Sequence, residues 1–216
     1  MEKFEQYTDI EVIQKIINNE TALFEILIRR NNPFLYKVGR SYGYSFENTQ
    51  DLMQDTFIDA YSNLSTFKNE ASFKTWIIKI MLNNCFRKKT KMSFKNELAN
   101  NIDDKSTPMF TSHQHTSKTV LNRELNFVIE NALQQIPFDY RMVFSLREVN
   151  GLSVQETAST LNISEANVKV RLNRAKAMLK KEVEKSYTAE DIFEFNLIYC
   201  DAMVNKVMTK IKEMNT

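Results

Sequence analysis

Apolar side chains recur every three or four residues along much of the chain, and this spacing predicts amphipathic helices. The clearest early run comprises Leu23, Phe24, Leu27 and Ile28. Pro33 and Gly43 are expected to break the helices that follow. The next helix begins after a cap at Ser45 or Asn48, and another is expected over about residues 73–89. Residues 8–92 therefore form a first predicted domain.

The periodicity disappears in residues 93–118, where Ser, Thr, Asn and Pro dominate. This composition is typical of a flexible linker. His113 and His115 lie in it, but two His without further ligands are a weak signal for a metal. We expect both side chains to be solvated, so we predict no metal site and no cofactor.

Helical spacing returns in residues 119–186, which we expect to form a second domain. Its first helix is marked by Leu121, Leu125, Val128, Ala132 and Ile136. Residues 187–216 carry a further apolar stripe, which predicts a C-terminal amphipathic helix. The predicted fold is therefore all-α, with two small helical domains joined by a flexible linker and followed by this helix.

The composition agrees with a helical protein, because turn-forming residues are scarce. The 216 residues include only three Gly and three Pro, and 43% are hydrophobic, which is enough for packed cores. No apolar run approaches the roughly 18 residues of a membrane helix, and the first residues lack the apolar segment of a signal peptide. Cys85 and Cys200 lie far apart and are expected to be buried thiols. We therefore expect a cytoplasmic protein without membrane insertion.

Four acidic residues line one face of the helix predicted after Ser45. Glu47, Asp51, Asp55 and Asp59 are spaced four residues apart. Like charges at this spacing destabilise a helix by roughly 0.2–0.5 kcal/mol per pair. The stripe is either an ordinary solvated face or a docking surface for a basic partner, and the repulsion favours the partner only modestly.

Aromatic and basic residues lie together on the helix predicted over residues 73–89. Trp76 borders a polar stripe that includes Lys79 and Asn83, and Arg87 and Lys88 follow. Such a surface suits single-stranded DNA, because bases stack on rings while cations hold phosphates. The alternative is that the aromatic residues are core, which we expect for Phe73, whereas Trp76 fits either role.

Residues 152–181 have the pattern of a helix-turn-helix. Ser153 and Ser164 can cap its two helices, and Asn162 tolerates the left-handed conformation that a tight turn needs. The second helix has an apolar face, which comprises Val168, Leu172, Ala175 and Leu179. Its other face is basic, since residues 163–185 hold seven Lys or Arg and three Glu. Such a helix fits the major groove of DNA, although a solvated helical hairpin has the same pattern.

The two domains together resemble the extracytoplasmic-function (ECF) group of bacterial RNA polymerase sigma factors. The resemblance covers about residues 8–186 and depends on two segments, DLMQDTFIDAYSNLSTFKNEASFKTWIIKIMLNNCFRKK and LQQIPFDYRMVFSLREVNGLSVQETASTLNISEANVKVRLNRAKAML. It implies a subunit that binds core RNA polymerase, recognises promoter minus-thirty-five and minus-ten elements, melts promoter DNA and directs transcription initiation.

The resemblance also implies roles for individual residues. The polymerase contact would comprise Asp51, Leu52, Gln54 and Asp55. The minus-ten contact would comprise Lys68, Asn69 and Glu70 in the loop, and Trp76, Lys79, Asn83, Arg87 and Lys88 on the helix. The minus-thirty-five contact would place four residues nearest the bases, namely Lys169, Val170, Asn173 and Arg174. Arg171 and Lys176 would contact phosphates.

Two features of this sequence differ from the family pattern. Asn162 stands where many helix-turn-helix proteins have Gly, and the two residues tolerate the same backbone conformation. Residues 187–216 lie beyond the minimal pattern, and they either fold back on the second domain or form a surface for an anti-sigma factor, which is a further expected partner.

A second hypothesis is a free-standing helix-turn-helix regulator that acts without stable polymerase association. It would bind duplex promoter DNA alone and would not need the acidic stripe. An enzyme has no support in the sequence, which lacks a Gly-rich phosphate loop, a metal-ligand cluster and a Ser-His-Asp set. We therefore expect no catalytic residues.

Overall fold

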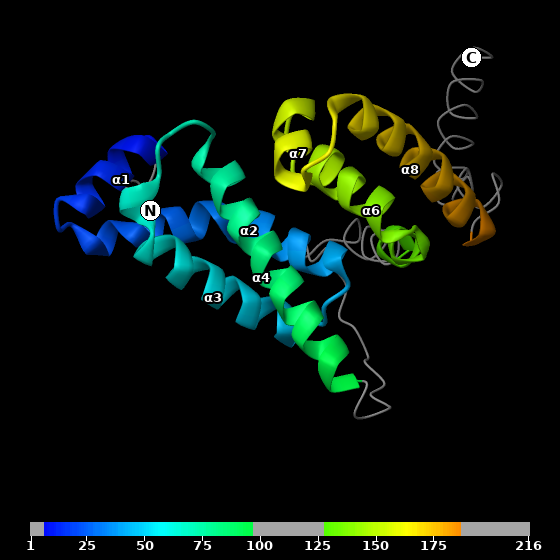
Figure 1. Cartoon of the computed structure of the whole chain (residues 1–216), viewed down its shortest axis with the longest axis horizontal. Helices are drawn as coiled ribbons and strands as arrows, with labels where there is room; N and C mark the ends of the chain where they lie inside the picture. Colours follow the sequence, from blue (N-terminus) through cyan, green and yellow to red (C-terminus); the bar gives the residue numbers. More distant parts are fainter. Residues whose placement is uncertain (1–6, 97–127, 187–216) are drawn as a thin grey trace, which may run out of the picture.

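The computed structural model describes residues 7–96 and 128–186, which form helices joined by short turns. The first range comprises α1 (Asp9–Ile17), η2 (Thr21–Leu23), α2 (Phe24–Tyr42), α3 (Phe46–Ser62), η3 (Leu64–Thr66) and α4 (Phe73–Asn96). The second comprises a helix over residues 128–135, α6 (Phe138–Phe144), the π-helical η4 (Ser145–Val149), α7 (Val154–Leu161) and α8 (Glu165–Ser186). These ranges contain no strand, so the prediction of an all-α fold is confirmed (Figure 1).

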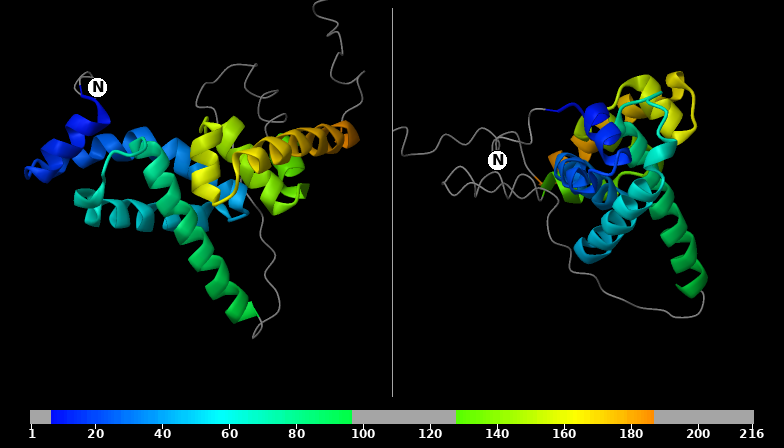
Figure 2. Two further views of the ribbon diagram at one scale, coloured as in Figure 1. Left: turned by 45° about the horizontal axis from the view of Figure 1, so that its top comes forward. Right: turned by 90° about the vertical axis from the view of Figure 1, so that its left-hand side faces the viewer.

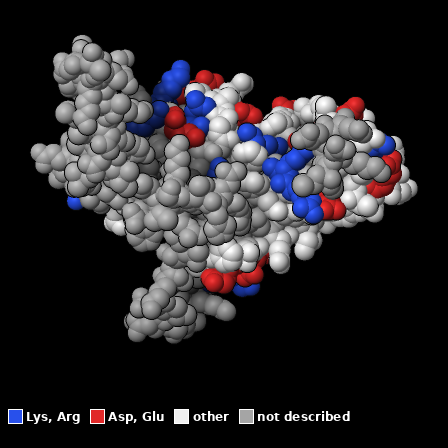
Figure 3. Space-filling model, turned by 180° about the vertical axis from the view of Figure 1, so that it is seen from behind, with Lys and Arg blue, Asp and Glu red and all other residues white. Residues whose placement is uncertain are grey.

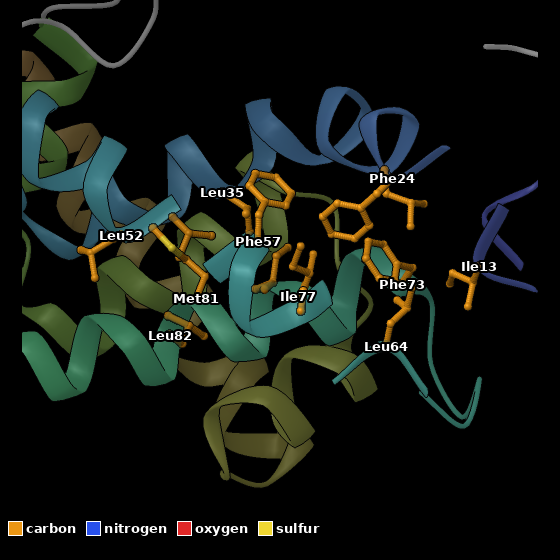
Figure 4. Packing of buried hydrophobic residues seen from close by; sticks show 14 of the residues in the cluster. Ile13, Phe24, Leu35, Leu52, Phe57, Leu64, Phe73, Ile77, Met81 and Leu82 are labelled. Atoms are coloured by element: carbon orange, nitrogen blue, oxygen red, sulfur yellow. The ribbon is translucent and has the colours of Figure 1, made fainter. Parts of the chain in front are cut away.

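The first domain is built on α2, α3 and α4, each of which packs against the other two. Apolar residues from all three helices, and from α1, meet in one core (Figure 4). Phe73 is 2% exposed, which confirms its predicted place in this core. Leu52 is also only 2% exposed, so it belongs to the core face of α3.

The helix ends follow the capping residues of the sequence, with one exception. Ser45 is the cap of α3, because its hydroxyl accepts a hydrogen bond from the Asn48 N–H at 3.2 Å. Gly43 ends α2 with a φ of 104°, a conformation that favours glycine. The predicted break at Pro33 is wrong, because Pro33 lies inside α2. Proline has no N–H group and so leaves one helical hydrogen bond unmade. The buried side chains of Leu27 and Leu35, on either side of it, hold the helix in place.

The second domain has the predicted helix-turn-helix. Ser153 begins α7 with a capping box, and Ser164 accepts a hydrogen bond from the Asn167 N–H at the start of α8. Asn162 between them has a φ of 53° and a ψ of 48°, the predicted left-handed conformation. Val168 and Ala175 of α8 are fully buried, as the apolar face predicts. Among the described residues, the helix α8 is thus packed along its apolar face.

The second domain packs directly on the first, along α2 and α4 (Figure 2). Its residues Met142, Leu146 and Leu152 are buried in the same cluster as the core of the first domain. The sequence did not predict this contact. The helix α4 continues to Asn96 and so into the predicted linker, whose remainder, with His113, His115 and the predicted C-terminal helix, lies outside the described residues.

At Gly39, α2 lies close to side chains of α3 and α4. A Cβ atom there would lie 2.6 Å from the Thr49 methyl group and 3.0 Å from the terminal methyl group of Met81. We therefore predict that Gly39→Ala lowers the free energy of unfolding by about 1–3 kcal/mol through overpacking. Denaturant unfolding would measure the change, with Gln50→Ala on the exposed side of α3 as the control. Equal stability of Gly39→Ala and wild type would contradict the close approach.

Candidate functional surfaces

The acidic stripe of α3 forms one wall of an open groove between α3 and α4. The groove has a volume of about 810 Å³ and is lined by Asp51, Leu52, Gln54, Asp55, Ile58, Asp59, Asn84, Arg87, Lys88 and Lys91. All four residues that were predicted for the polymerase contact therefore lie in one place. Asp51, Gln54 and Asp55 are exposed at the surface, whereas Leu52 contributes only the floor of the groove.

The opposite wall of this α3–α4 groove is basic, and it neutralises part of the stripe. Arg87 forms an ion pair with Asp59 at 3.3 Å, and Lys88 lies 3.9 Å from Asp51. Asn84 also donates a hydrogen bond to Asp59 at 3.0 Å. Two of the four acids thus have partners within the domain, which relieves the repulsion that the sequence predicts. Asp55 has no ion-pair partner among the described residues.

Ile58 was missed by the sequence analysis, although it belongs to the same surface. It is 64% exposed and lies one helical turn beyond Asp55, at the edge of the groove. The signal in the sequence was its spacing of seven from Asp51, which places the two residues on one face. The groove therefore offers an apolar contact next to its charges.

The residues predicted for the minus-ten contact lie around Trp76. A hollow of about 320 Å³, here the Trp76 hollow, is lined by Thr66, Phe67, Lys68, Asn69, Glu70, Ala71, Thr75, Trp76, Lys79, Ser159 and Thr160. Trp76 is half-buried and packs on Phe67 and Phe73, with ring centroids 5.3 and 5.6 Å apart. It is therefore both a core residue and part of the surface.

The remaining residues of the predicted minus-ten contact divide between two places. Asn83 and Arg87 line a neighbouring hollow that Trp76 also borders. Lys88 lies apart from these two hollows, in the α3–α4 groove, and its ammonium group lies 5.9 Å from the centre of the Tyr44 ring. The structure thus brings seven of the predicted residues around Trp76 and places Lys88 with the acidic stripe, which Arg87 also contacts.

The Trp76 hollow also includes residues of the second domain, which the sequence analysis did not predict. Ser159 and Thr160 of α7 form part of its wall. Thr75, which precedes Trp76 on α4, is 6% exposed because α7 covers it. Contacts between residues about 80 positions apart leave no periodic signal, so the sequence could not show this arrangement.

The recognition helix α8 presents its predicted DNA-contacting residues away from its buried face. Lys169, Val170 and Asn173 are exposed, with Val170 at 48%. Arg171 forms an ion pair with Asp139 at 3.2 Å. Arg174 contacts the Tyr140 hydroxyl at 3.4 Å.

Acidic residues pair with several of the basic residues on both domains. Lys176 forms an ion pair with Glu148 at 2.9 Å, which repeats the pattern of Arg171. On the face drawn in Figure 3, Lys and Arg side chains likewise lie beside Asp and Glu side chains. Arg171 and Lys176 of α8 are therefore held in place by ion pairs within the second domain.

The ionisable groups of the described residues offer little for catalysis. Burial raises the pKa of the Cys85 thiol to about 12, so this thiol stays protonated at neutral pH. No group of three or more His, Cys, Asp or Glu side chains in the described ranges could hold a metal ion. Among the described helices, none combines the length and apolar character of a membrane span.

Comparison with known proteins identifies the family. Residues 27–93 match Sigma-70 region 2, and residues 127–179 match Sigma-70, region 4. The ECF RNA polymerase sigma-E factor of Escherichia coli K12 is 24% identical over 186 residues, which cover 83% of this chain and 96% of that protein. The sigma-E factor of Haemophilus influenzae is 24% identical over 185 residues, or 83% and 97% of the two chains.

Two solved structures share the fold. CnrH, in complex with the cytosolic domain of CnrY, has a TM-score of 0.60 and 21% identity over 83% of this chain and 99% of its own. The sigma factor RpoE from Bartonella quintana, in complex with the anti-sigma factor NepR, has a TM-score of 0.63 and 19% identity over 74% and 96%. With regions 2 and 4 in order along a helical structure, this chain belongs to the ECF group of sigma factors, which are DNA-binding proteins of transcription initiation rather than enzymes.

Proposed function

We propose that this protein binds core RNA polymerase, recognises the minus-thirty-five and minus-ten elements of a promoter, melts promoter DNA, and directs transcription initiation. One observation carries the proposal: the first domain has both an exposed acidic groove and an aromatic hollow beside cations. A free-standing duplex-binding regulator needs neither feature. We propose the cytoplasm as the place where it acts.

The α3–α4 groove supports the proposed polymerase contact. Its exposed acids, Asp51 and Asp55, would meet a basic surface of the polymerase, while Ile58 supplies an apolar contact between the charges. Charge complementarity of this kind steers encounters and disfavours wrong partners. Lys88 would release Asp51 when the polymerase binds. This release costs little, because an exposed ion pair contributes only about 0–1 kcal/mol to stability.

The Trp76 hollow supports the proposal that the protein melts the minus-ten element without ATP. Extruding a base from a duplex costs a few kcal/mol. A base that stacks on an aromatic side chain regains about 1–3 kcal/mol, and nearby cations such as Lys68 and Lys79 hold the phosphates. Binding of the melted strand could thus offset the cost of opening the duplex.

The helix α8 supports the proposal that the protein recognises the minus-thirty-five element as duplex DNA. Asn173 is exposed and has the amide that pairs with adenine, and Arg174 can pair with guanine. Arg171 and Lys176 would exchange their present partners, Asp139 and Glu148, for phosphates. An anti-sigma factor is a further proposed partner, since the solved structures of CnrH and RpoE both hold a second protein.

The proposal is tested by adding the purified chain to core polymerase and a library of promoter fragments, and then sequencing the transcripts. We expect new start sites that share a two-part motif upstream. Core polymerase alone is the control. A protein that shifts duplex DNA in gels but starts no transcripts would instead be a free-standing regulator.

The polymerase contact gives a second prediction. The double variant Asp51→Lys, Asp55→Lys should bind core polymerase at least about tenfold more weakly, because like charges placed in a contact cost several kcal/mol. Fluorescence titration with labelled polymerase would measure the affinity. The matched control is Glu20→Lys, Glu25→Lys, which changes the net charge equally at exposed positions on another surface. Equal affinities of the two double variants would rule out docking through the groove.

The recognition helix gives a third prediction, which separates base contacts from phosphate contacts. In the holoenzyme, Asn173→Ala should cost about 1–3 kcal/mol and relax the preference at one base pair of the minus-thirty-five element. Lys176→Gln should weaken binding evenly across sequences and reduce the slope of affinity against salt by about 1. Competition assays with single-base promoter variants would measure both effects. A sequence-dependent loss for Lys176→Gln would refute its assignment to phosphate.

A further inference from the structure

Two carboxylates from outside the helix-turn-helix reach the flanks of its second helix. Arg171 of α8 forms an ion pair with Asp139 of α6 at 3.2 Å, and Lys176 of α8 forms one with Glu148 of η4 at 2.9 Å. Five residues separate Arg171 from Lys176, or about 140° around the helix at 3.6 residues per turn. The two acids, here named the flank acids, therefore lie on opposite flanks of α8, which packs on α6.

These ion pairs involve only some of the cations of α8. Lys169, on the exposed face, has no ion-pair partner among the described residues, and Arg174 contacts the neutral hydroxyl of Tyr140 at 3.4 Å. Both residues are proposed to lie nearest the bases. Arg171 and Lys176, by contrast, are the two cations that the proposed function assigns to phosphates. The flank acids thus pair with the cations that would bind any DNA sequence.

The stability of the domain does not explain the flank acids. The side chains of Asp139 and Glu148 are 59% and 36% exposed, and ion pairs at such exposure contribute little to the free energy of unfolding. Their effect on DNA binding is expected to be larger, because phosphate contacts supply essentially all of the non-specific affinity of a DNA-binding protein. Each of the two phosphate contacts has to displace a carboxylate first.

The distribution of charge in the second domain follows the same pattern. Residues 165–186 hold seven Lys or Arg and three Glu, a net charge of +4. Residues 128–164 hold two Arg and four acidic residues, a net charge of −2. The segment that precedes α8 therefore offsets half of its positive charge, and it does so with two acids placed directly against the helix.

We propose that Asp139 and Glu148 limit the non-specific DNA affinity of the helix-turn-helix. Arg171 and Lys176 give up a carboxylate for each phosphate that they bind, and the released carboxylate then repels the DNA backbone. At a random sequence the domain makes phosphate contacts alone, so it dissociates readily, whereas at the correct sequence base contacts add to the affinity. The inference rests on the proposed function, because it takes duplex DNA as the ligand of α8.

The test compares the full wild-type chain with the double variant Asp139→Asn, Glu148→Gln. Fluorescence anisotropy with a labelled random-sequence duplex would measure the affinity over a series of salt concentrations. We expect the variant to bind about fivefold more tightly, because two exposed ion pairs no longer compete with phosphates. We also expect a steeper slope of log affinity against log salt concentration, by up to about 0.9 for each of the two phosphate contacts, since more counterions are released.

Two control variants isolate the effect of the flank acids. Glu20→Gln, Glu25→Gln removes the same number of charges from exposed ion pairs of the first domain, and it should bind the duplex as wild type does. Asp139→Glu, Glu148→Asp keeps both charges on the flanks of α8 and should likewise match wild type. Circular dichroism would verify that each variant is folded.

The outcomes separate this inference from the proposed function. If the double variant and wild type bind the random duplex with equal affinity and equal salt slope, while wild type directs transcription with core polymerase, the inference is wrong and the function stands. Weaker binding by the double variant would also overturn the inference, since the acids would then hold the two cations in position for DNA. If no form of the chain binds duplex DNA even at low salt, the inference and the proposed role of α8 are both wrong. Tighter binding with a steeper salt slope, absent from both controls, establishes the role of the flank acids.

Discussion

The buried contact between Arg40 and Glu130 determines how the two domains meet. Both charges have left water, so each depends on the other, and removing one of them typically costs about 3–5 kcal/mol. An apolar pair of the same volume would often be equally stable, so the ion pair is not needed for affinity between the domains. The pair is directional, because Nη2 and Nε of Arg40 both donate to one carboxylate oxygen of Glu130 in the docking position of the structure. In that position Leu146 is buried in the core cluster of the first domain, and Ser159 and Thr160 line the Trp76 hollow.

Internal pairing of exposed charges is a second constraint on the functional surfaces. Asp59 faces Arg87, Asp139 faces Arg171, and Glu148 faces Lys176. Each pair contributes little to stability and is easily exchanged for another partner. The pairs nevertheless fix long side chains and balance the net charge, which is only +2 for the whole chain. A nearly neutral protein has weak non-specific attraction to DNA, so binding depends on the correct groups meeting.

The sequence predicted most features that depend on neighbouring residues, and few that depend on contacts between distant parts of the chain. The caps at Ser45 and Ser153, the left-handed turn at Asn162 and the buried face of α8 all depend on residues within a few positions of one another. The predicted helix break at Pro33 was wrong, because packing of buried residues on both sides of it outweighs the tendency of proline to end a helix. The burial of Thr75 was not predicted, because α7, which covers it, lies about 80 positions away along the chain. The site residues were located through family resemblance, and their predicted roles remain to be tested.

Cys85 lies where α4 meets the core, fully buried and with a thiol that stays protonated. Oxidants and alkylating reagents attack the thiolate, so they cannot modify this sulfur in the folded domain. Its modification therefore requires α4 to detach first. The rate of labelling at Cys85, read separately from that at Cys200, therefore reports the opening of the first domain without an engineered probe.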